Sequence, residues 1–528
     1  MIVYTHMKKM KVSALISRIY TPLCLFLLTF TIAGYFSLLG VDPHHDGLMF
    51  KSAFDVARGS MVFRDTFLQY GALTTLLQAW ALLLFGKYLM TVQLLTAFFY
   101  GLIAALLYVI YRKIMPPFLS FVTILLWIFM APYFYAPFLP WASVYALFFQ
   151  LAGTYLLILY EERGNAWHLV WVGAATTAVF WTRQPGGVCM LGAVYAYLLC
   201  PFITKTESIK KFVRAVYLYT CGVAFTTSCF LIWIAARGAF RDFWLQSFLN
   251  AYTWGIHQFG TTIYGVIVQL FPGDKSIGFR NIGFLWSVFP GATILVGIAC
   301  LIALVRKYHV KQTKTILIIA AIGLSAWNQY YPLHDERHIY WGASQMFGLL
   351  PFALFAVSGY LLSFVPKLRR KLALGVTCIV LAYFFTPHIV PRVIAAAEKI
   401  RTPYVTVSKP DILRGMLMPA GDAQFYTSVS RIIDLYFQKN PKGNVVNTSE
   451  DGLYGTFDPR IRNIHPLFIS WTQFSYTYPD FFSKTDAYIQ THKPLIIGRE
   501  AVRDGYCPLI QSPDNFDIVD YVVVLYPC

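Results

Sequence analysis

"IYTPLCLFLLTFTIAGYFSLLGVDPHHDG" occupies residues 19–47 and joins a long apolar run to the densest polar cluster of the chain. The run 19–40 follows a basic segment, and it is long enough to cross a bilayer as an α-helix, which takes about 20 apolar residues. It is too long for a secretory signal peptide and lacks a clear small-residue cleavage site. We therefore expect a retained membrane anchor.

Similar apolar runs recur along most of the 528-residue chain, in which 57% of residues are hydrophobic and only 13% are charged. A soluble domain has about a quarter charged residues, so this composition indicates a multi-pass integral membrane protein. No run has an acidic residue in its middle. We predict an all-α membrane domain of about eleven transmembrane helices, at 19–40, 90–111, 118–136, 141–160, 167–183, 186–203, 215–236, 284–305, 315–332, 343–364 and 372–389.

Lysine and arginine gather at the start of the chain and in alternate connections between these runs. Short cytoplasmic loops are enriched in these residues, so we expect a cytoplasmic N-terminus and, after eleven spans, an outer C-terminal part. The residues are Lys8, Lys9, Lys11, Arg18, Arg112, Lys113, Arg163, Lys205, Lys210, Lys211, Arg214, Arg306, Lys307, Lys311, Lys314, Lys367, Arg369, Arg370 and Lys371. The net charge of +18 is thus mostly anchoring. Since no basic stripe lies on a soluble domain, we expect no nucleic-acid partner.

The sequence changes character after about residue 390, with turn signals such as "NPKGN" and short β-rich runs such as "YVVVLYP". We therefore divide the chain into a multi-span domain, 1–389, and an extracytoplasmic α/β or α+β domain, 390–528. Cys507 and Cys528 are the two cysteines of the second domain. An oxidising compartment would permit a disulfide between them, and two unpaired thiols are the alternative.

The first outer loop, residues 41–89, has apolar residues at roughly helical spacing, which predicts helices lying in the membrane interface. These residues are Phe50, Phe54, Val56, Leu73, Leu76, Leu77 and Trp80. We expect the loop to be a folded lid pressed against the membrane. It would present Asp42, Asp46 and Asp65 to one shallow cavity.

The polar cluster at the start of this loop comprises Asp42, His44, His45 and Asp46. Asp followed by Pro is a normal helix opening, so Asp42 can be read as a helix cap. Capping does not account for His44, His45 and Asp46, which follow where ionisable groups are costly to desolvate. Charged residues at membrane depth indicate a functional site.

The first 200 residues or so resemble the GT-C glycosyltransferases, multi-span enzymes that take sugars from polyprenyl-phosphate carriers. The resemblance is to the branch of protein mannosyltransferases and aminoarabinose transferases. It rests on "HHDG" after the first span, "FRDTFLQYGALTTLLQAWALLLFGK" in the same loop and "FWTRQPGG" between the fifth and sixth spans. The family's usual Asp-Glu pair is absent, because Asp46 is followed by Gly47.

The resemblance implies a GT-C-like fold and transfer of one monosaccharide from a polyprenyl-phosphate donor to an envelope glycan, lipid or protein acceptor. A carboxylate suits deprotonation of the acceptor hydroxyl, and we assign Asp46 as the general base, with Asp65 in reserve. A guanidinium matches phosphate oxygens, and Arg183 is the strong cation at a span boundary outside the basic flanks, so we assign it to the donor phosphate.

"YYPLHDERHIYWG" (330–342) is a second dense polar stretch. Arg337 and His338 are further candidates for phosphate binding, and His334 and Asp335 would line the site. His334 and His338, four residues apart, could hold a divalent metal with Asp46, although two histidines make only half a site and the metal requirement stays open. The alternative is a solvated turn between two spans.

Two other functions stay open: a transporter or flippase for a lipid-linked glycan, and a non-catalytic envelope assembly protein. Transporters usually show internal repeats and ionisable residues at mid-membrane, whereas the polar residues here gather in outer loops. We expect an enzyme of the bacterial inner membrane, with the endoplasmic reticulum as the alternative. Aromatic groups such as "WASVY" (141–145) are interpreted as packing.

Overall fold

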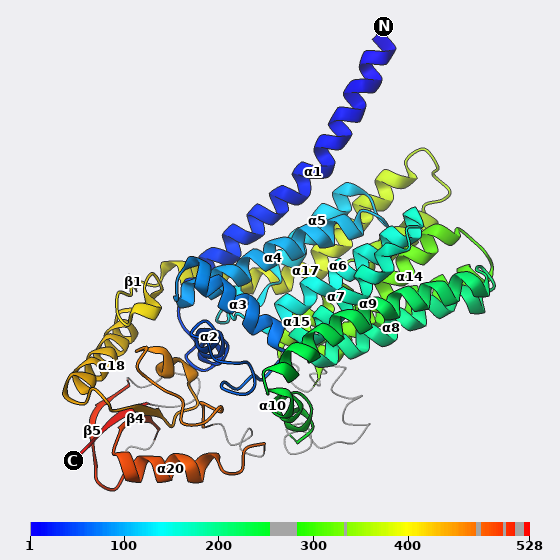
Figure 1. The fold of residues 1–528 in the computed structure, drawn as a ribbon. Helices are drawn as coiled ribbons and strands as arrows, with labels where there is room; N and C mark the ends of the chain where they lie inside the picture. The colour runs from blue at the N-terminus through cyan, green and yellow to red at the C-terminus, as the bar shows by residue number, and fades with distance from the viewer. Residues whose placement is uncertain (1, 254–281, 332–334, 471–476, 500–502, 513–521) are drawn as a thin grey trace.

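The fold comes from a computed structural model. It describes the backbone of residues 2–253, 282–331, 335–470, 477–499, 503–512 and 522–528, and side chains from residue 19 onward. A helical bundle forms one part of the molecule and a smaller domain with a β-sheet forms the other, with α2 (His45–Val56) between them (Figure 1).

Each of the eleven apolar segments predicted as spans contains a helix in the described residues. They correspond to α1 (Ile2–Ser37), α4 (Leu89–Tyr111), α5 (Pro117–Phe129), α6 (Ala142–Arg163), α7 (Trp167–Thr182), α8 (Gln184–Ile203), α9 (Ile209–Ala236), α13 (Ile282–Val305), α14 (Val310–Ser325), α16 (Leu349–Leu361) and α17 (Arg369–Arg401). Shorter helices are η1 (Pro132–Phe134), α10 (Phe240–Trp244), η2 (Leu245–Leu249), η3 (Ala326–Tyr330), α15 (Glu336–Ala343), η4 (Asp411–Leu413) and η5 (Gly452–Thr456).

Seven helices in the described ranges are long and apolar enough to cross a membrane, which makes this a multi-pass membrane protein. They are α1, α4, α6, α8, α9, α13 and α17. The other four, α5, α7, α14 and α16, have 13 to 16 residues. At about 1.5 Å per residue they reach roughly 20–24 Å, less than the ~30 Å hydrocarbon core. Eleven crossings therefore stay a prediction.

The C-terminal part contains the mixed α and β structure that the sequence predicts. β1 (Tyr404–Thr406) pairs antiparallel with β2 (Leu417–Pro419). A four-stranded sheet has the order β3-β4-β6-β5, in which β3 and β4 are parallel and the other neighbours antiparallel. Its strands are β3 (Val445–Asn447), β4 (Leu495–Gly498), β5 (Tyr506–Gln511) and β6 (Val523–Pro527). The helices of this part are α18 (Ala420–Lys439) and α20 (Phe481–His492).

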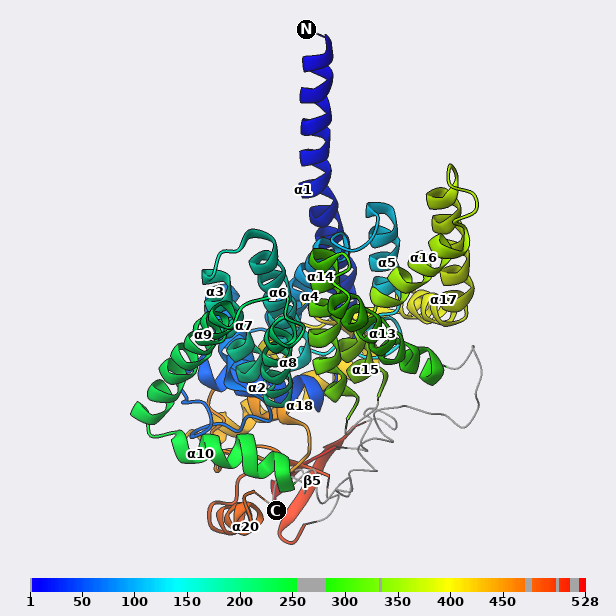
Figure 2. The ribbon, with the colours of Figure 1, turned by 90° about the vertical axis from the view of Figure 1, so that its right-hand side faces the viewer.

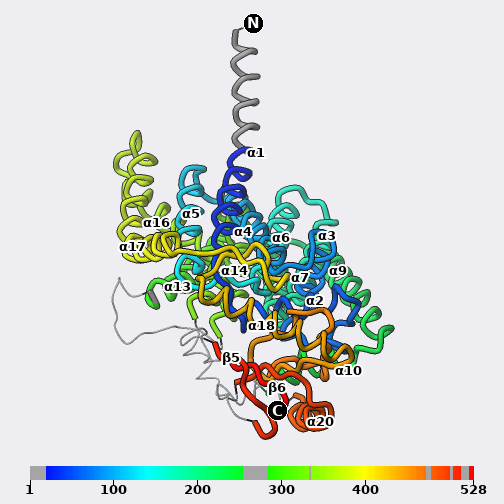
Figure 3. Tube along the Cα trace, turned by 90° about the vertical axis from the view of Figure 1, so that its left-hand side faces the viewer, coloured from blue at the N-terminus to red at the C-terminus, as the bar shows by residue number. Residues whose placement is uncertain are grey.

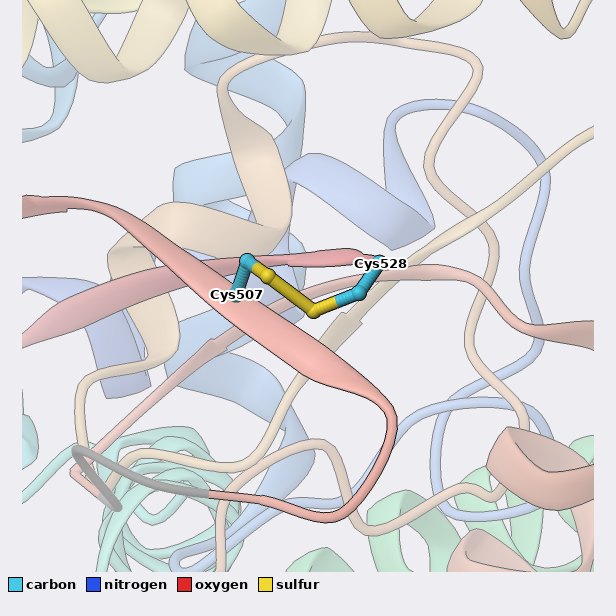
Figure 4. The surroundings of a disulfide bond; sticks show 2 residues. All are labelled: Cys507 and Cys528. Atoms are coloured by element: carbon cyan, nitrogen blue, oxygen red, sulfur yellow. A yellow bond between two sulfur atoms is a disulfide. The ribbon is translucent and has the colours of Figure 1, made fainter.

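Two features bear on the predicted limits of this domain. α17 continues across residue 390 to Arg401, so the division at 390 stays a prediction. Cys507 of β5 and Cys528, which follows β6, are joined by a disulfide of 2.05 Å (Figure 4). The bond fastens the end of the chain to the edge strand of the sheet.

Helix α3 (Ala72–Phe85) in the first outer loop has the exposed apolar surface expected of a helix at the membrane interface. Trp80, Leu83, Leu84 and Phe85 are all at least 60% exposed. Apolar side chains that protein does not cover are suited to contact with lipid.

Helix α2 differs from the expected interfacial helix, because all residues from Asp46 to Asp55 are buried. Its Phe50 and Phe54 belong to one apolar core cluster with residues of α18, and Figure 3 shows both helices. Gly47 allows α2 to pack closely against η5 (Gly452–Thr456), since a Cβ at this position would lie 2.3 Å from the backbone nitrogen of Leu453. The close approach of α2 to η5 explains a glycine directly after Asp46.

Candidate active site

Asp42 and His45 form a hydrogen-bonded pair at the start of α2. Asp42 Oδ1 accepts the backbone N–H of His45 at 2.8 Å, and Oδ2 lies 2.8 Å from His45 Nδ1. The capping role predicted for Asp42 is therefore present, and the same carboxylate orients an imidazole. Burial opposes ionisation of Asp42, but the hydrogen bond and charge of His45 outweigh it and lower the pKa of the carboxyl. The His45 side chain is 24% exposed and that of Asp42 is fully enclosed.

Asp46 lies one helical turn after Asp42 and is buried. Its Oδ2 accepts the backbone N–H of Asp42 at 2.9 Å, and its Oδ1 accepts Nε2 of Gln93, on α4, at 2.7 Å. Burial, and next the charge of Asp42, raise the pKa of Asp46 well above its ordinary value. Through hydrogen bonds accepted at both of its oxygens, Asp46 fastens the loop to α4. In this arrangement it is poorly placed to accept a proton from a substrate.

His44 points toward the C-terminal domain. Its Nδ1 lies 2.8 Å from the backbone oxygen of Glu450, and Arg499 Nη1 lies 3.1 Å from Glu450 Oε1. Burial, and next the charge of His45, lower the pKa of His44 to about 4. The histidine is therefore neutral at pH 7 and joins the start of α2 to the sheet domain.

A run of ring contacts connects His45 to Arg183. The rings of His45 and Trp141 are 5.3 Å apart, and those of Trp141 and Tyr70 are 5.2 Å apart. The Arg183 guanidinium lies 5.6 Å from the centre of the Tyr70 ring and donates to Ser143 Oγ. Contacts through two aromatic rings thus connect His45 to Arg183, although the two residues are 138 positions apart in sequence.

Local backbone structure explains how Arg183 and Tyr70 meet. Arg183 lies in an extended conformation between α7 and α8, which places a cation at the junction of the two helices. Gly71 donates its N–H to the Thr182 carbonyl at 3.2 Å. A Cβ on Gly71 would lie 2.2 Å from the Trp181 carbonyl oxygen, so glycine is required for this contact.

The second polar stretch reaches the same place through Asp335, the N-cap of α15. Asp335 Oδ1 accepts the backbone N–H of His338 at 2.9 Å, and Arg337 Nη2 lies 3.5 Å from Oδ2. Burial opposes ionisation of Asp335, but His338 and Arg337 outweigh it and lower its pKa, whereas burial lowers the pKa of His338. The charges of Asp335 and Arg337 both act on Tyr70, whose pKa is raised by burial to about 12.

Asp65 lies elsewhere in the loop between α2 and α3. It accepts the Met61 backbone N–H at 2.8 Å and forms an ion pair with Arg64, also at 2.8 Å. The hydrogen bonds and ion pairs found in the described ranges do not join it to the Asp42 and His45 pair. His334 lies outside the described residues. Within those residues, no three His, Cys, Asp or Glu side chains are grouped as a metal site.

Sequence reasoning missed the aromatic link and a buried ion pair. Trp141 belongs to the "WASVY" segment that was interpreted as packing, and its neighbour Tyr70 precedes the glycine that fixes the loop on α7. Lys51 and Asp55 form an ion pair on α2 with 2% and 6% exposed side chains. Their i, i+4 spacing was visible in the sequence, but their burial by the C-terminal domain was not.

No protein-family model matches the sequence, and no curated protein matches it. Among solved structures, ArnT from Cupriavidus metallidurans in the apo state superposes with a TM-score of 0.57 and 11% identity, over 95% of this chain and 97% of that one. The same protein bound to undecaprenyl phosphate superposes with a TM-score of 0.49 and 12% identity, again over 95% of this chain and 97% of that one. The oligosaccharyltransferase of Archaeoglobus fulgidus superposes with a TM-score of 0.48 and 11% identity, over 91% of this chain and 69% of that one.

The superposition on apo ArnT shows the class of fold. ArnT is a GT-C fold glycosyltransferase, and nearly the full length of both chains is matched. The chain therefore has the GT-C fold, as the resemblance of its first 200 residues or so implies.

Proposed function

We propose that this protein is a membrane glycosyltransferase that moves one sugar from a polyprenyl-phosphate donor to an envelope glycan, lipid or protein acceptor. The observation that supports this most is the contact path from Asp42 and His45 through Trp141 and Tyr70 to Arg183. It joins a proton acceptor, an aromatic surface and a cation in a chain with the GT-C fold.

The donor is proposed to be lipid-linked, because nucleotide sugars are absent outside the cytoplasm, where we place the site. Its phosphate would bind Arg183, with Arg337 and His338 beside it. A guanidinium offers several N–H donors in a plane that matches phosphate oxygens. Arg183 has further N–H groups beyond the one that it donates to Ser143.

The base is proposed to be His45, oriented by Asp42. An imidazole held by a carboxylate at one ring nitrogen can take a proton at the other. The acceptor hydroxyl attacks the anomeric carbon, its proton passes to His45 Nε2, and the bond from the anomeric carbon to the phosphate oxygen breaks. Polyprenyl phosphate leaves, and direct displacement inverts the anomeric centre. In this geometry Asp46 anchors the loop, and Asp65 stays a reserve base.

We place the enzyme in a bacterial inner membrane, with its N-terminus in the cytoplasm and its C-terminal domain in the periplasm. The basic residues between the helical segments support this orientation. The disulfide between Cys507 and Cys528 supports an oxidising compartment for the C-terminal domain.

Purified protein in nanodiscs, given radiolabelled polyprenyl-phosphate monosaccharides and an envelope extract, tests the proposal. We expect one donor to yield a labelled envelope product of inverted configuration, with release of polyprenyl phosphate. A product of retained configuration would defeat the direct displacement. Absence of transfer with every donor, from folded protein, would defeat the enzyme assignment and favour a transporter or an assembly protein.

A further inference from the structure

A large cavity lies at the end of the bundle remote from the C-terminal domain. The turn between α4 and α5, the second half of α16 and the start of α17 form it, and Figure 2 shows α5 and the α16–α17 hairpin opposite β5 and α20. Its volume is about 570 Å³. The site described above lies at the other end, so this cavity is separate from it.

The cavity is strongly basic. Arg112, Lys113, Arg369 and Arg370 line it. Lys113 is neutralised by Glu162 at 2.7 Å. In the part of the chain that the structure describes, no carboxylate pairs with any of the three arginines. Arg112 lies 5.7 Å from the centre of the Tyr108 ring, and Arg369 Nε donates to the Gly359 carbonyl.

The remaining lining is apolar, and the surface around it is too. Ile114, Met115, Pro117 and Phe355 share the cavity with the arginines. Next to it, the exposed large apolar side chains are Phe118, Tyr360, Leu361 and Phe364, each 57% to 75% exposed. A free phosphate would gain nothing from these groups, whereas a lipid would place its acyl chains on them and its phosphate against the arginines.

We propose that this cavity binds the headgroup of an anionic phospholipid of the bilayer. Basic pockets between transmembrane helices on the cytoplasmic side are suited to such headgroups. The lipid would join α16 and α17 to α4 and α5 across a surface where three guanidinium groups have no carboxylate partner among the described residues. The general preference for basic cytoplasmic loops explains cations at this end. It does not explain a cavity lined by three arginines without carboxylate partners.

Matched double variants separate the two explanations. Arg112→Gln with Arg370→Gln removes two charges from the cavity, and Arg306→Gln with Lys307→Gln removes two from the turn between α13 and α14, which does not line it. Phosphatidylglycerol bound to delipidated protein is measured by native mass spectrometry. Since each basic residue near the surface is worth about fivefold in affinity, we expect roughly 25-fold weaker binding for the cavity variant and little change for the control.

Thermal stability in nanodiscs gives a second readout. Phosphatidylglycerol should raise the unfolding temperature of the wild type above that in phosphatidylcholine, and the cavity variant should lose this gain. Equal lipid binding by both double variants would overturn the proposal. Equal stabilisation by inorganic phosphate in phosphatidylcholine would also overturn it, because no lipid would be required. If the glutamine variant fails to fold, Arg370→Gln alone is measured against Arg306→Gln by the same criteria.

Discussion

Replacing Lys51 by methionine tests whether a buried ion pair holds the first outer loop to the C-terminal domain. Lys51 Nζ lies 2.5 and 2.6 Å from the two carboxylate oxygens of Asp55. Asp55 Oδ2 also accepts from Asn463 Nδ2 at 2.8 Å and from Thr66 Oγ1 at 3.2 Å. The pair thus joins α2 to the segment after η5. Methionine keeps the length of the side chain and removes its charge.

The expected loss is large because the carboxylate stays buried. Breaking a buried pair by removing one partner costs about 3–5 kcal/mol. At roughly 3 °C per kcal/mol for a domain of this size, the apparent Tm should fall by roughly 9–15 °C. The double variant Lys51→Met with Asp55→Asn should recover most of this. The amide oxygen of the asparagine that replaces Asp55 can still accept hydrogen bonds from Asn463 and Thr66, and no buried charge is left.

The effect is measured as the unfolding temperature in detergent. Cleavage of the C-terminal domain by added protease reports whether this domain has separated from the loop. The matched control is Lys484→Met, which removes an i, i+4 ion pair with Asp480 whose side chains are 60% and 47% exposed. An exposed pair of this kind is worth about 0.3–0.5 kcal/mol. A similar small shift for both variants, or no recovery in the double variant, would show that the ion pair of Lys51 and Asp55 does not hold the loop to the C-terminal domain.

Three further predictions follow from the site and the sheet. Arg183→Ala should weaken donor binding by roughly 10- to 150-fold, the worth of about 1.5–3 kcal/mol for hydrogen bonds to a charge, with acceptor binding unchanged; wild-type donor affinity would refute its role. The pKa of His44 is lowered to about 4 in the folded protein, so the unfolded chain binds a proton at this residue more readily. The contribution of neutral His44 to the stability of the fold is therefore lost as the pH falls from 6.5 toward 4. Asp46 has the opposite sign, since its raised pKa makes its stabilisation fade as pH rises above about 4. Between pH 4.5 and 7, the melting temperature of His44→Gln should fall less than that of the wild type as the pH is lowered. The melting temperature of Asp46→Asn should fall less than that of the wild type as the pH is raised. If both variants follow the pH dependence of the wild type, both predicted directions are wrong. Replacing Cys507 and Cys528 by serine opens a loop with a sequence separation of 21 and should cost about 3 kcal/mol, and an unchanged denaturation midpoint would exclude a stabilising role.

The helices were predictable because long apolar runs have few other stable forms in a membrane protein. The α3 surface was also predictable, since Trp80 and its exposed apolar neighbours repeat at helical spacing. The burial of α2 was not. Phe50 and Phe54 have the same apolarity whether lipid or protein covers them, and η5, which packs against α2, lies some 400 residues further along the chain.

The site was predictable in its parts but not in its arrangement. Asp42, His45 and Arg183 stood out as ionisable residues at the ends of apolar runs. The fold places two neighbouring carboxyls in different environments. Asp46 is buried and bonded to Gln93, whereas Asp42 is paired with His45, whose side chain is partly exposed. The sequence could not show which of these two carboxyls is enclosed, because the difference comes from the contact of Asp46 with Gln93 on α4.

Sugar transfer by the wild type, His45→Gln and Asp46→Asn is compared with transfer by the matched control, His492→Gln. His492 is exposed at the end of α20, so its substitution should leave transfer unchanged. We expect the wild type and the control to transfer sugar from a polyprenyl-phosphate donor. For His45→Gln we expect at least a hundredfold loss, the lower part of the range for general base catalysis, and for Asp46→Asn substantial activity. Full activity in His45→Gln with abolition in Asp46→Asn would contradict this assignment and make Asp46 the base.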